Sequence, residues 1–516
     1  MNGVNEMSVD GEGRRASSLD QTREEIRELA AQAAALVEDY FAQVSELRVF
    51  PETSASQVAE RLDTPLPEEG LPLERLMEDC RAIIGASRHN GHPRFFGYVA
   101  SPSTPAGAYA DLMASTLNAN VTSWRSSPAA TQLEKTVIRW LGSLTGYSED
   151  ARGLLTSGGS MANLNAILIA HRAKSFGPVA QQGLWQAGKP MTLYASDQVH
   201  MSIPKAADVL GLGRDYVRLV SSDADFRLNV RELRERIEAD KRAGLKPFCV
   251  VASAGTVNTG AVDPLAEIAR VALEHELWFH VDGAYGALGS LDQTKRHLFK
   301  WLERADSVSL DAHKWLYAPV GCGSLLFHNE EVARSAFRTG EADYIKVLEE
   351  TDDESFAFWD YGIELSRRFR ALKVWMMLSY YGAGRVAAAI REDNELAVYL
   401  SELVGASDDF ELLAPVTLSI CCFRYAPARM RQMLAQADAE VRERASGELN
   451  QLNARIMHLV QRGGRAYLSN ATLNGDFALR VCITNFRTTR ADIRRTLDIL
   501  REAAQELVEE EKSSTS

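Results

Sequence analysis

The amino-acid sequence predicts an α/β protein with a mainly parallel sheet and helices on both faces. From about residue 150, short apolar runs alternate with stretches of helical periodicity, as in β-α-β units. The 516 residues are 46% apolar, enough for a large core without disulfide or metal staples. The 57 basic and 70 acidic side chains give a net charge of −13, which argues against a nucleic-acid-binding protein. Since the sequence contains no run of about 18 apolar residues, we expect no membrane span.

The N-terminal part is expected to be a leader followed by helices. Residues 1–20 lack the apolar stretch of a secretory signal, and we expect them to be disordered. Segment 21–110 is expected to be helical and to pack on a partner subunit. Within it, residues 22–47 carry apolar side chains at helical spacing, and Thr22 suits the start of a capping box. The proline-containing stretch 51–73 is expected to be a loop, although an ordinary surface helix with no partner is the alternative for 22–47.

Segment 111–390 is expected to be the large domain. Its buried strands are expected at 191–197, 216–220, 248–255, 277–286, 306–315 and 323–328. Helices such as 230–243 and 265–276 lie between them. Because ligands of such sheets bind beyond the carboxyl ends of the strands, the polar residues that end these runs are the candidates for function.

Segment 391–516 is expected to be a smaller α/β domain. Strands are expected at 416–425 and 477–484, and helices near 449–461 and from about 490. The six cysteines form no C-x-x-C pair and no regular framework: Cys80, Cys249, Cys322, Cys421, Cys422 and Cys482. We therefore expect free thiols in a reducing compartment, the cytoplasm.

Two strand ends carry side chains suited to covalent and charge chemistry. Lys314 follows one strand and precedes a glycine-rich stretch, and a lysine with a lowered pKa can form a Schiff base. The alternative is a surface lysine. Asp282 closes another strand and is followed by small residues, so it could pair with a protonated pyridine nitrogen of a flat ligand. The alternative is a carboxylate that caps the next turn.

Two further segments suit a phosphate and a ring. Gly159 and Ser160 begin a helical run, where free N–H groups, a hydroxyl and the helix dipole would bind phosphate; a plain N-cap is the alternative. No Walker lysine and no G-x-G-x-x-G pattern is present here. His200 lies just beyond a strand and could stack on a ring or relay a proton, or be structural. A phosphate site, a pyridinium partner, a Schiff-base lysine and a stacking histidine together predict pyridoxal 5′-phosphate as cofactor.

No metal site is expected. His275, Glu276 and His280 lie close in sequence, as do His89 and His92. Neither group has three ligands at a recognised zinc spacing, so we interpret both as structural.

Seven motifs carry a family resemblance: HPRFFGY (92–98), SWRSSPAATQLE (123–134), TSGGSMANL (156–164), DQVHMSIPKA (197–206), HVDGAYG (280–286), DAHKWLY (311–317) and LSRRFRALKVW (365–375). Through them the chain resembles the group II pyridoxal-phosphate decarboxylases, the family of aromatic-L-amino-acid decarboxylase, from His92 to about Arg490. The resemblance implies a fold type I homodimer with active sites at the subunit interface. It also implies a lyase that converts an L-amino acid to an amine and carbon dioxide through an external aldimine and a quinonoid.

The resemblance also implies residue roles. Lys314 would bind the cofactor covalently, Asp282 would pair with its ring nitrogen, and His200 would stack on its ring. The other implied cofactor contacts are Gly159, Ser160, Thr256, Ala284, Asp311 and His313. Asp311 stands where the family often has asparagine. Tyr344 matches a tyrosine on a mobile loop that returns a proton to Cα, and the acidic stretch 349–354 after it suits a lid; a solvated loop without a chemical part is the alternative.

The substrate side is expected to be aromatic. The residues expected to border the substrate, besides His200, are Ser101, Tyr98, Phe96 and Trp124, and aromatic walls suit an aromatic amino acid. Asn120 and Thr122 stand where animal aromatic decarboxylases have apolar residues, so a hydroxylated ring or another amino acid stays open. Arg125 raises the possibility of an acidic substrate. Two further functions stay open: an aldehyde-forming synthase, which the phenol at Tyr344 disfavours, and an inactive scaffold.

Overall fold

A computed structural model describes residues 19–514 except 176–178, 185–187, 339–353 and 437. The described residues form two compact units. The first comprises the chain up to Leu47 and Pro51–Arg88, and the second comprises Arg48–Phe50 and the chain from His89 onward.

The first unit is helical. It contains α1 (Arg23–Gln43), α2 (Ala55–Leu62) and α3 (Leu73–Gly85). The capping box at Thr22 is confirmed, since its side chain accepts from the Glu25 N–H and the Glu25 side chain accepts from the Thr22 N–H. The expected loop at 51–73 is wrong in part, because a second capping box, from Ser54 to Gln57, starts α2 there. No residue of α1 is buried.

The second unit contains the predicted mainly parallel sheet. Its seven strands have the order β2-β8-β7-β6-β5-β3-β4, and only β8 runs antiparallel to its neighbours. They are β2 (Arg152–Thr156), β3 (Met191–Ser196), β4 (Val217–Val220), β5 (Lys246–Ser253), β6 (Trp278–Asp282), β7 (Ser307–Asp311) and β8 (Gly323–Phe327). The expected strands from 191 to 328 are therefore present, whereas β2 was not predicted. The strands predicted at 277–286 and 306–315 each end four residues earlier than expected, at Asp282 and Asp311, because a turn follows the first and α11 follows the second.

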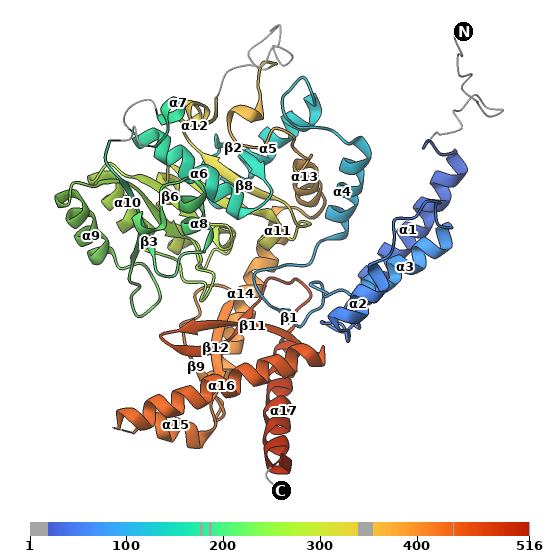
Figure 1. Cartoon of the computed structure of the whole chain (residues 1–516), viewed down its shortest axis with the longest axis vertical. Helices are drawn as coiled ribbons and strands as arrows, with labels where there is room; N and C mark the ends of the chain where they lie inside the picture. The colour runs from blue at the N-terminus through green and yellow to red at the C-terminus, as the bar shows by residue number, and fades with distance from the viewer. Residues whose placement is uncertain (1–18, 176–178, 185–187, 339–353, 437, 515–516) are drawn as a thin grey trace. The chain divides into compact units, whose positions relative to one another are not determined.

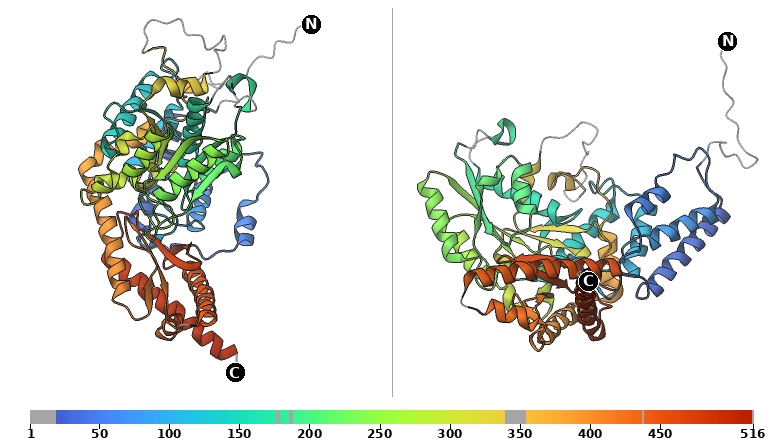
Figure 2. Two further views of the ribbon diagram at one scale, coloured as in Figure 1. Left: turned by 90° about the vertical axis from the view of Figure 1, so that its left-hand side faces the viewer. Right: turned by 60° about the horizontal axis from the view of Figure 1, so that its bottom comes forward.

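Helices cover both faces of this sheet (Figures 1 and 2). They are α4 (Pro105–Leu117), α5 (Pro128–Thr145), α6 (Gly159–Lys174), α7 (Val179–Gln182), α8 (Ser202–Val209), α9 (Val230–Arg242), α10 (Leu265–Glu274), α11 (Ala312–Trp315), α12 (Glu330–Phe337) and α13 (Ala371–Tyr381). Helix α6 packs on β2 and β5–β8, and most of its apolar side chains are buried. The predicted α/β class with helices on both faces is confirmed.

A smaller five-stranded sheet has the order β1-β11-β12-β10-β9. Its strands are β1 (Phe95–Phe96), β9 (Phe410–Leu412), β10 (Ile420–Tyr425), β11 (Tyr467–Leu473) and β12 (Asp476–Cys482), with helices α14 (Ala383–Gly405), α15 (Ala428–Leu434), α16 (Ala439–Gly463) and α17 (Arg490–Ser514). β1 pairs in parallel with β11. Residues 89–110, which the sequence groups with the N-terminal helices, therefore lie in the second unit.

A buried ion pair connects α5 with β2. Arg367 Nη2 lies 2.5 Å from Glu134 Oε1, and neither side chain has any exposed surface. Glu134 Oε1 also accepts from the Leu155 N–H at 2.8 Å, and Arg367 Nη2 donates to the Leu155 carbonyl at 2.8 Å. The pair thus holds β2 just before the glycine-serine turn that follows it.

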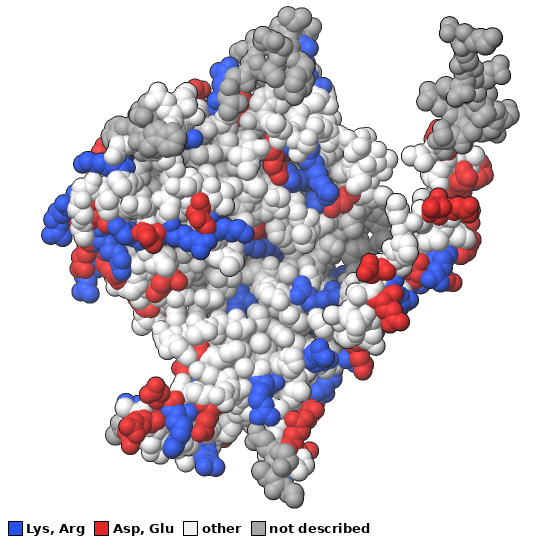
Figure 3. All heavy atoms as spheres, in the orientation of Figure 1, with Lys and Arg blue, Asp and Glu red and all other residues white. Residues whose placement is uncertain are grey.

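The surface carries charges of both signs, and the cysteines are the free thiols that the sequence predicts. On the face drawn in Figure 3, basic and acidic side chains are interspersed. All six cysteines are free thiols, and all except Cys80 are buried. In the described part of the chain, no helix is both long and apolar enough to cross a membrane.

Candidate active site

The carboxyl ends of β3, β5, β6 and β7 lie at one edge of the large sheet, because these strands are parallel. The segments that follow them line a cavity of about 500 Å³. The predicted site residues that line it are Tyr98, Gly159, Ser160, His200, Thr256, Asp282, Ala284, Asp311, His313 and Lys314. Residues that are far apart in the chain are thus brought to one cavity.

Lys314 presents its amine to this cavity next to a carboxylate. It lies in the short helix α11, three residues after Asp311, so one helical turn brings the two side chains together. Lys314 Nζ is 3.0 Å from Asp311 Oδ2, and its side chain is 20% exposed. Asp311 Oδ1 is buried and has no hydrogen-bond partner in the described part of the chain. A buried polar atom of this kind is available to a bound ligand.

Asp282 is a buried carboxylate at the end of β6, level with Ser253 and Ser309 on the neighbouring strands. Its Oδ1 accepts from the Ala284 N–H and from Ser309 Oγ, both at 3.1 Å. Burial alone would raise the pKa of Asp282, but the charge of Lys314, the histidines and the Ala284 N–H outweigh it and hold this pKa below its ordinary value. The site therefore keeps a negative charge on the cavity wall.

Asn163 was not predicted from the sequence. Its side chain contacts Asp282, Ser202 and His280, and so it orients the buried acid and its neighbours. Its Nδ2 donates to Asp282 Oδ2 and to Ser202 Oγ, each at 2.9 Å. Its Oδ1 lies 3.0 Å from His280 Nε2. Burial lowers the pKa of His280 to about 4, so this ring is neutral at pH 7 and donates from Nε2. Asn163 lies one helical turn after Gly159, a spacing that could have identified it.

His200 is held in a fixed orientation by Ser202. His200 Nδ1 lies 2.8 Å from Ser202 Oγ and accepts from the Ser202 N–H at 3.2 Å. Burial lowers the pKa of His200 and the charge of Lys314 lowers it further, whereas Asp282 and Asp311 act in the opposite direction. The ring is therefore neutral at pH 7, a state suited to lying over an aromatic ligand.

The glycine-serine turn is tightly enclosed. Gly159 is the first residue of α6, and a Cβ there would lie 2.8 Å from the Ala284 Cβ and 2.9 Å from Asp311 Oδ2. Such distances exclude any larger residue unless the backbone shifts. Gly159 and Ser160, at the N-terminus of α6, border the cavity at this point, which is the arrangement that binds phosphate.

Two further predicted residues have structural contacts here. Thr256 lines the cavity, and its hydroxyl lies 3.0 Å from Thr259 Oγ1 and accepts from the Ala261 N–H at 3.2 Å. Ser101 does not line the cavity; its Oγ donates to the His313 carbonyl at 2.9 Å, one residue before Lys314.

The predicted aromatic wall is smaller than expected. Phe96 cannot contact a ligand in this cavity, because its side chain is fully buried in the core of the smaller sheet. Trp124 also lies outside the cavity lining, and its backbone N–H donates to the Phe356 carbonyl. The tyrosines among the residues that line it are Tyr98 and Tyr285. Tyr98 has φ +59°, a strained conformation of the kind that clusters at ligand sites.

The polar residues expected near the substrate have other partners. Asn120 Oδ1 accepts from the Arg367 N–H at 2.8 Å, and Thr122 Oγ1 lies 2.8 Å from Ser126 Oγ. Neither these two residues nor Arg125 lines the cavity. They therefore do not give the cavity the polar character that the sequence left open. Tyr344 falls outside the described residues.

Arg480, on β12, was also not predicted from the sequence. Its Nη1 donates to the Tyr98 carbonyl at 2.7 Å, and its Nε donates to the Val257 carbonyl at 2.9 Å. Arg480 is 3% exposed, and its Nη2 is buried without a hydrogen-bond partner in the described residues. This guanidinium fixes two segments of the cavity wall from the smaller sheet.

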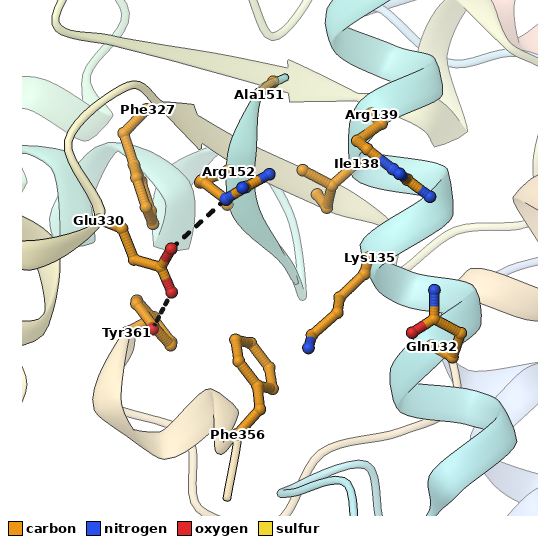
Figure 4. Close-up of a pocket in the computed structure, with 11 residues that line it drawn as sticks. Gln132, Lys135, Ile138, Arg139, Ala151, Arg152, Phe327, Glu330, Phe356 and Tyr361 are labelled. Atoms are coloured by element: carbon orange, nitrogen blue, oxygen red, sulfur yellow. Dashed lines mark hydrogen bonds and ion pairs between the residues drawn. The ribbon is translucent and has the colours of Figure 1, made fainter. Parts of the chain in front are cut away.

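A second cavity, of about 430 Å³, lies near the opposite end of β2 (Figure 4). Lys135 and Arg139 of α5 and Arg152 of β2 line it, together with aromatic rings. Arg152 Nε lies 3.4 Å from Glu330 Oε2. None of the predicted site residues that the structure describes borders it. No group of three or more histidine, cysteine, aspartate or glutamate residues suited to a metal ion occurs within the described ranges.

The residues of the first cavity fit pyridoxal 5′-phosphate. The glycine cradle at 159 leaves space that a Cβ would fill, the unpartnered Asp311 oxygen is buried beside it, and Lys314 and Asp282 border the same cavity. The donor set combines N–H groups for a phosphate, an amine for an aldehyde and a buried acid for a ring nitrogen.

The comparisons agree with this geometry. The "pyridoxal-dependent decarboxylase conserved domain" matches residues 55–426. The chain is 34% identical to the aromatic-L-amino-acid decarboxylase of Bacillus atrophaeus over 95% of this chain and 98% of that one. It is 29% identical to the 4-hydroxyphenylacetaldehyde synthase of Rhodiola rosea, over 94% of this chain and 96% of that one. The crystal structure of Oryza sativa TDC with PLP and tryptamine has a TM-score of 0.85 at 26% identity, over 95% of this chain and 100% of that one.

The match covers most of the chain, and the cavity contains the lysine, the acid and the glycine-serine turn that the cofactor needs. The predicted fold type I architecture and the predicted cofactor are confirmed. The chain therefore belongs to the pyridoxal-dependent decarboxylases and is a pyridoxal-phosphate-dependent amino-acid decarboxylase.

Proposed function

We propose that the protein converts an aromatic L-amino acid to its amine and carbon dioxide. The observation that carries this is the single cavity in which Lys314, Asp282 and His200 meet the Gly159 turn. Tyr98 among the lining residues and the relatives named for aromatic substrates favour an aromatic side chain.

The residues of the site have separate roles in the proposed reaction. Bound pyridoxal 5′-phosphate supplies a ring that accepts the electron pair of the broken Cα–carboxylate bond. Lys314 would hold it through the aldehyde carbon, and Gly159 and Ser160 would hold the phosphate. Asp282, kept negative by its neighbours, would retain a proton on the ring nitrogen. The neutral His200 ring, fixed by Ser202, would cover one face of the ring. Tyr344 is proposed to return a proton to Cα after carbon dioxide leaves.

A second candidate function is oxidative conversion, in which dioxygen and water convert the amino acid to an aldehyde, carbon dioxide, ammonia and hydrogen peroxide. It is supported by the similarity to the 4-hydroxyphenylacetaldehyde synthase of Rhodiola rosea. The phenol at position 344 favours the amine instead. A product assay across the proteinogenic amino acids, scoring amine, aldehyde and carbon dioxide, distinguishes the two. Release of aldehyde in equal amount to carbon dioxide would refute the amine proposal.

The covalent attachment has its own test. Borohydride treatment of the protein reconstituted with pyridoxal 5′-phosphate should abolish the visible absorption band and add the cofactor mass to the peptide that contains Lys314. Lys314→Ala should show neither the band nor the added mass. A band that survives in Lys314→Ala would contradict the assignment.

We also propose a cytoplasmic homodimer with active sites at the subunit interface, in which residues 21–110 pack on the partner. α4 begins in this segment and continues beyond it to Leu117, and it exposes an apolar set on its surface: Tyr109, Leu112, Met113 and Leu117. In α1, no residue is buried, although the helix carries apolar residues. Sets of this kind mark protein interfaces. Leu112→Glu should convert the dimer to monomers, which light scattering would measure. The free thiols support the other part of the proposal, a reducing compartment.

A further inference from the structure

Both aromatic side chains that follow Lys314 in the DAHKWLY motif donate to one buried carboxyl group. Trp315 Nε1 lies 2.9 Å from Asp393 Oδ2, and the Tyr317 hydroxyl lies 2.8 Å from the same oxygen. Asp393 lies on α14 and is 1% exposed. Its Oδ1 accepts from the Asn485 N–H, at 3.4 Å. A residue of α14 is thus bonded to the segments directly after the cofactor lysine and after β12.

The turn that Asp393 holds is strained. Tyr317 has φ +54°, which is unfavourable for an aromatic residue and persists only where the surroundings impose it. The local bond from the Tyr317 N–H to the Lys314 carbonyl is long, at 3.4 Å. The Thr104 N–H donates to the Tyr317 carbonyl at 3.0 Å. Tertiary contacts therefore decide the conformation of the turn, and the Asp393 carboxyl group is the acceptor that both rings share.

The same carboxyl group also supports the cavity wall. Trp315 stacks on Tyr285 with ring centroids 5.0 Å apart and planes 24° apart, and Tyr285 lines the cavity. The Tyr285 hydroxyl lies 2.7 Å from Ser419 Oγ. Asp393 forms no ion pair with any residue that the structure describes. Burial, with a smaller effect from the charge of Glu392, raises its pKa to about 7, and the hydrogen bonds from Trp315, Tyr317 and the Asn485 N–H only partly offset this. An apolar side chain at position 393 would fill the same space without the cost of burying a carboxyl group. The presence of Asp393 there points to a role in specifying one conformation of the turn.

We propose that Asp393 is a positioning residue that acts through Trp315 and Tyr317 to hold the Lys314 turn against the cavity. Asp393 does not itself line the cavity. Its part is to keep the Lys314 amine beside Asp311 and the Tyr285 wall in place. This inference rests on the proposed function, since it takes Lys314 as the residue that binds the cofactor.

The chain offers a matched control for the test. Asn394 is the next residue of α14 and is equally buried, at 1% exposure. Its Nδ2 donates to Asp292 Oδ2 at 2.9 Å, and it makes no contact with the lysine turn among the described hydrogen bonds. Asp393→Ala and Asn394→Ala therefore remove buried polar groups of similar size from neighbouring positions. Asp393→Asn keeps the shape and one acceptor oxygen.

The readouts are the visible spectrum of the reconstituted protein as a function of pH, kcat and KM, and the Tm of the protein without cofactor. Asp393→Ala should shift the pH midpoint of the visible band by about one unit and lower kcat about tenfold. Asn394→Ala should lower only Tm. Asp393→Asn should keep the midpoint close to that of the unmodified protein, because one acceptor oxygen remains.

Equal spectra for Asp393→Ala and Asn394→Ala would overturn the inference, as would a loss confined to Tm. If Asp393→Ala does not fold, Tyr317→Phe gives the decision, since it removes one of the two ring donors to Asp393 and should move the midpoint in the direction expected for Asp393→Ala. Asp393→Asn should then stay close to the unmodified protein. Absence of the visible band in the unmodified protein would refute the proposed function itself, whereas a normal band with unmoved variants refutes only the role of Asp393.

Discussion

Asn163 Nδ2 donates to Asp282 Oδ2 at 2.9 Å and thereby joins α6 to the acid at the end of β6. The same amide nitrogen donates to Ser202 Oγ, which is bonded to His200 Nδ1. One buried side chain thus sets the orientation of both the predicted ring-nitrogen partner and the predicted ring-stacking histidine.

Replacement of Asn163 by alanine should therefore impair both partners. We expect kcat to fall about 10- to 100-fold, because Asp282 loses a donor that stabilises its charged form. The loss should appear in steady-state assays of carbon dioxide release. Asn165→Ala, at an equally buried position of α6, is the control and should keep kcat within about twofold. Equal losses in both variants would show that general destabilisation, not the Asp282 contact, is responsible.

Gly159→Ala should weaken cofactor binding. The new Cβ would lie under 3.0 Å from Ala284 and Asp311, so the turn must move away from the phosphate. We expect the apparent Kd for pyridoxal 5′-phosphate, from titration of the visible band, to rise about tenfold or more. A Cβ at Gly447 in α16 meets no atom within 4 Å, so Gly447→Ala should leave the Kd unchanged. An unchanged Kd in Gly159→Ala would remove the turn from the cofactor site.

Arg367→Met should unfold the protein at lower denaturant concentration. The substitution leaves Glu134 buried without its cation, which costs about 3–5 kcal/mol. Urea denaturation of the cofactor-free protein measures the loss. Arg231 forms a distant, exposed pair with Glu235, and Arg231→Met should change the midpoint little. Similar midpoints for the two variants would contradict the importance of the buried pair.

The buried His280 should make stability depend on pH. Its folded-state pKa of about 4 lies below the ordinary 6.5, so the unfolded chain binds the proton first as pH falls. The contribution of His280 is complete above pH 6.5 and is lost as pH falls toward 4, by about 3 kcal/mol. His280→Gln should flatten the stability profile in this window, whereas His297→Gln, at an exposed position, should not. An unaltered slope in His280→Gln would contradict the buried, neutral state.

Tyr344→Phe should change the product. Without the phenol, protonation at Cα slows and the competing oxidative route releases more aldehyde. We expect the rate of amine formation to fall about 100-fold or more, because general-acid catalysis contributes about that much. The amine-to-aldehyde ratio, measured by chromatography with each aromatic amino acid, is the readout. Unaltered yields of both products would exclude Tyr344 as the acid.

The strand ends were predictable because alternation of apolar runs with helices already implies parallel strands, and parallel strands end at one edge. Residue type and position along the chain therefore suffice to place Asp282, Asp311 and Lys314 together. They do not suffice for α2, since its start depends on the side-chain cap at Ser54 and not on apolar periodicity. β2 was not predicted from the sequence, because it is short and its first two residues are not buried.

The sequence by itself determined the α/β class and the cofactor, and it identified Lys314 as the candidate to bind that cofactor, since these follow from local patterns of residue type. Only the tertiary structure decided that Phe96 belongs to a core and that Asn163 and Arg480 bond to residues of the cavity, and only it shows the contacts from which the role of Asp393 is proposed. Those roles arise from contacts across large sequence separations, which close packing creates and which leave no local periodicity.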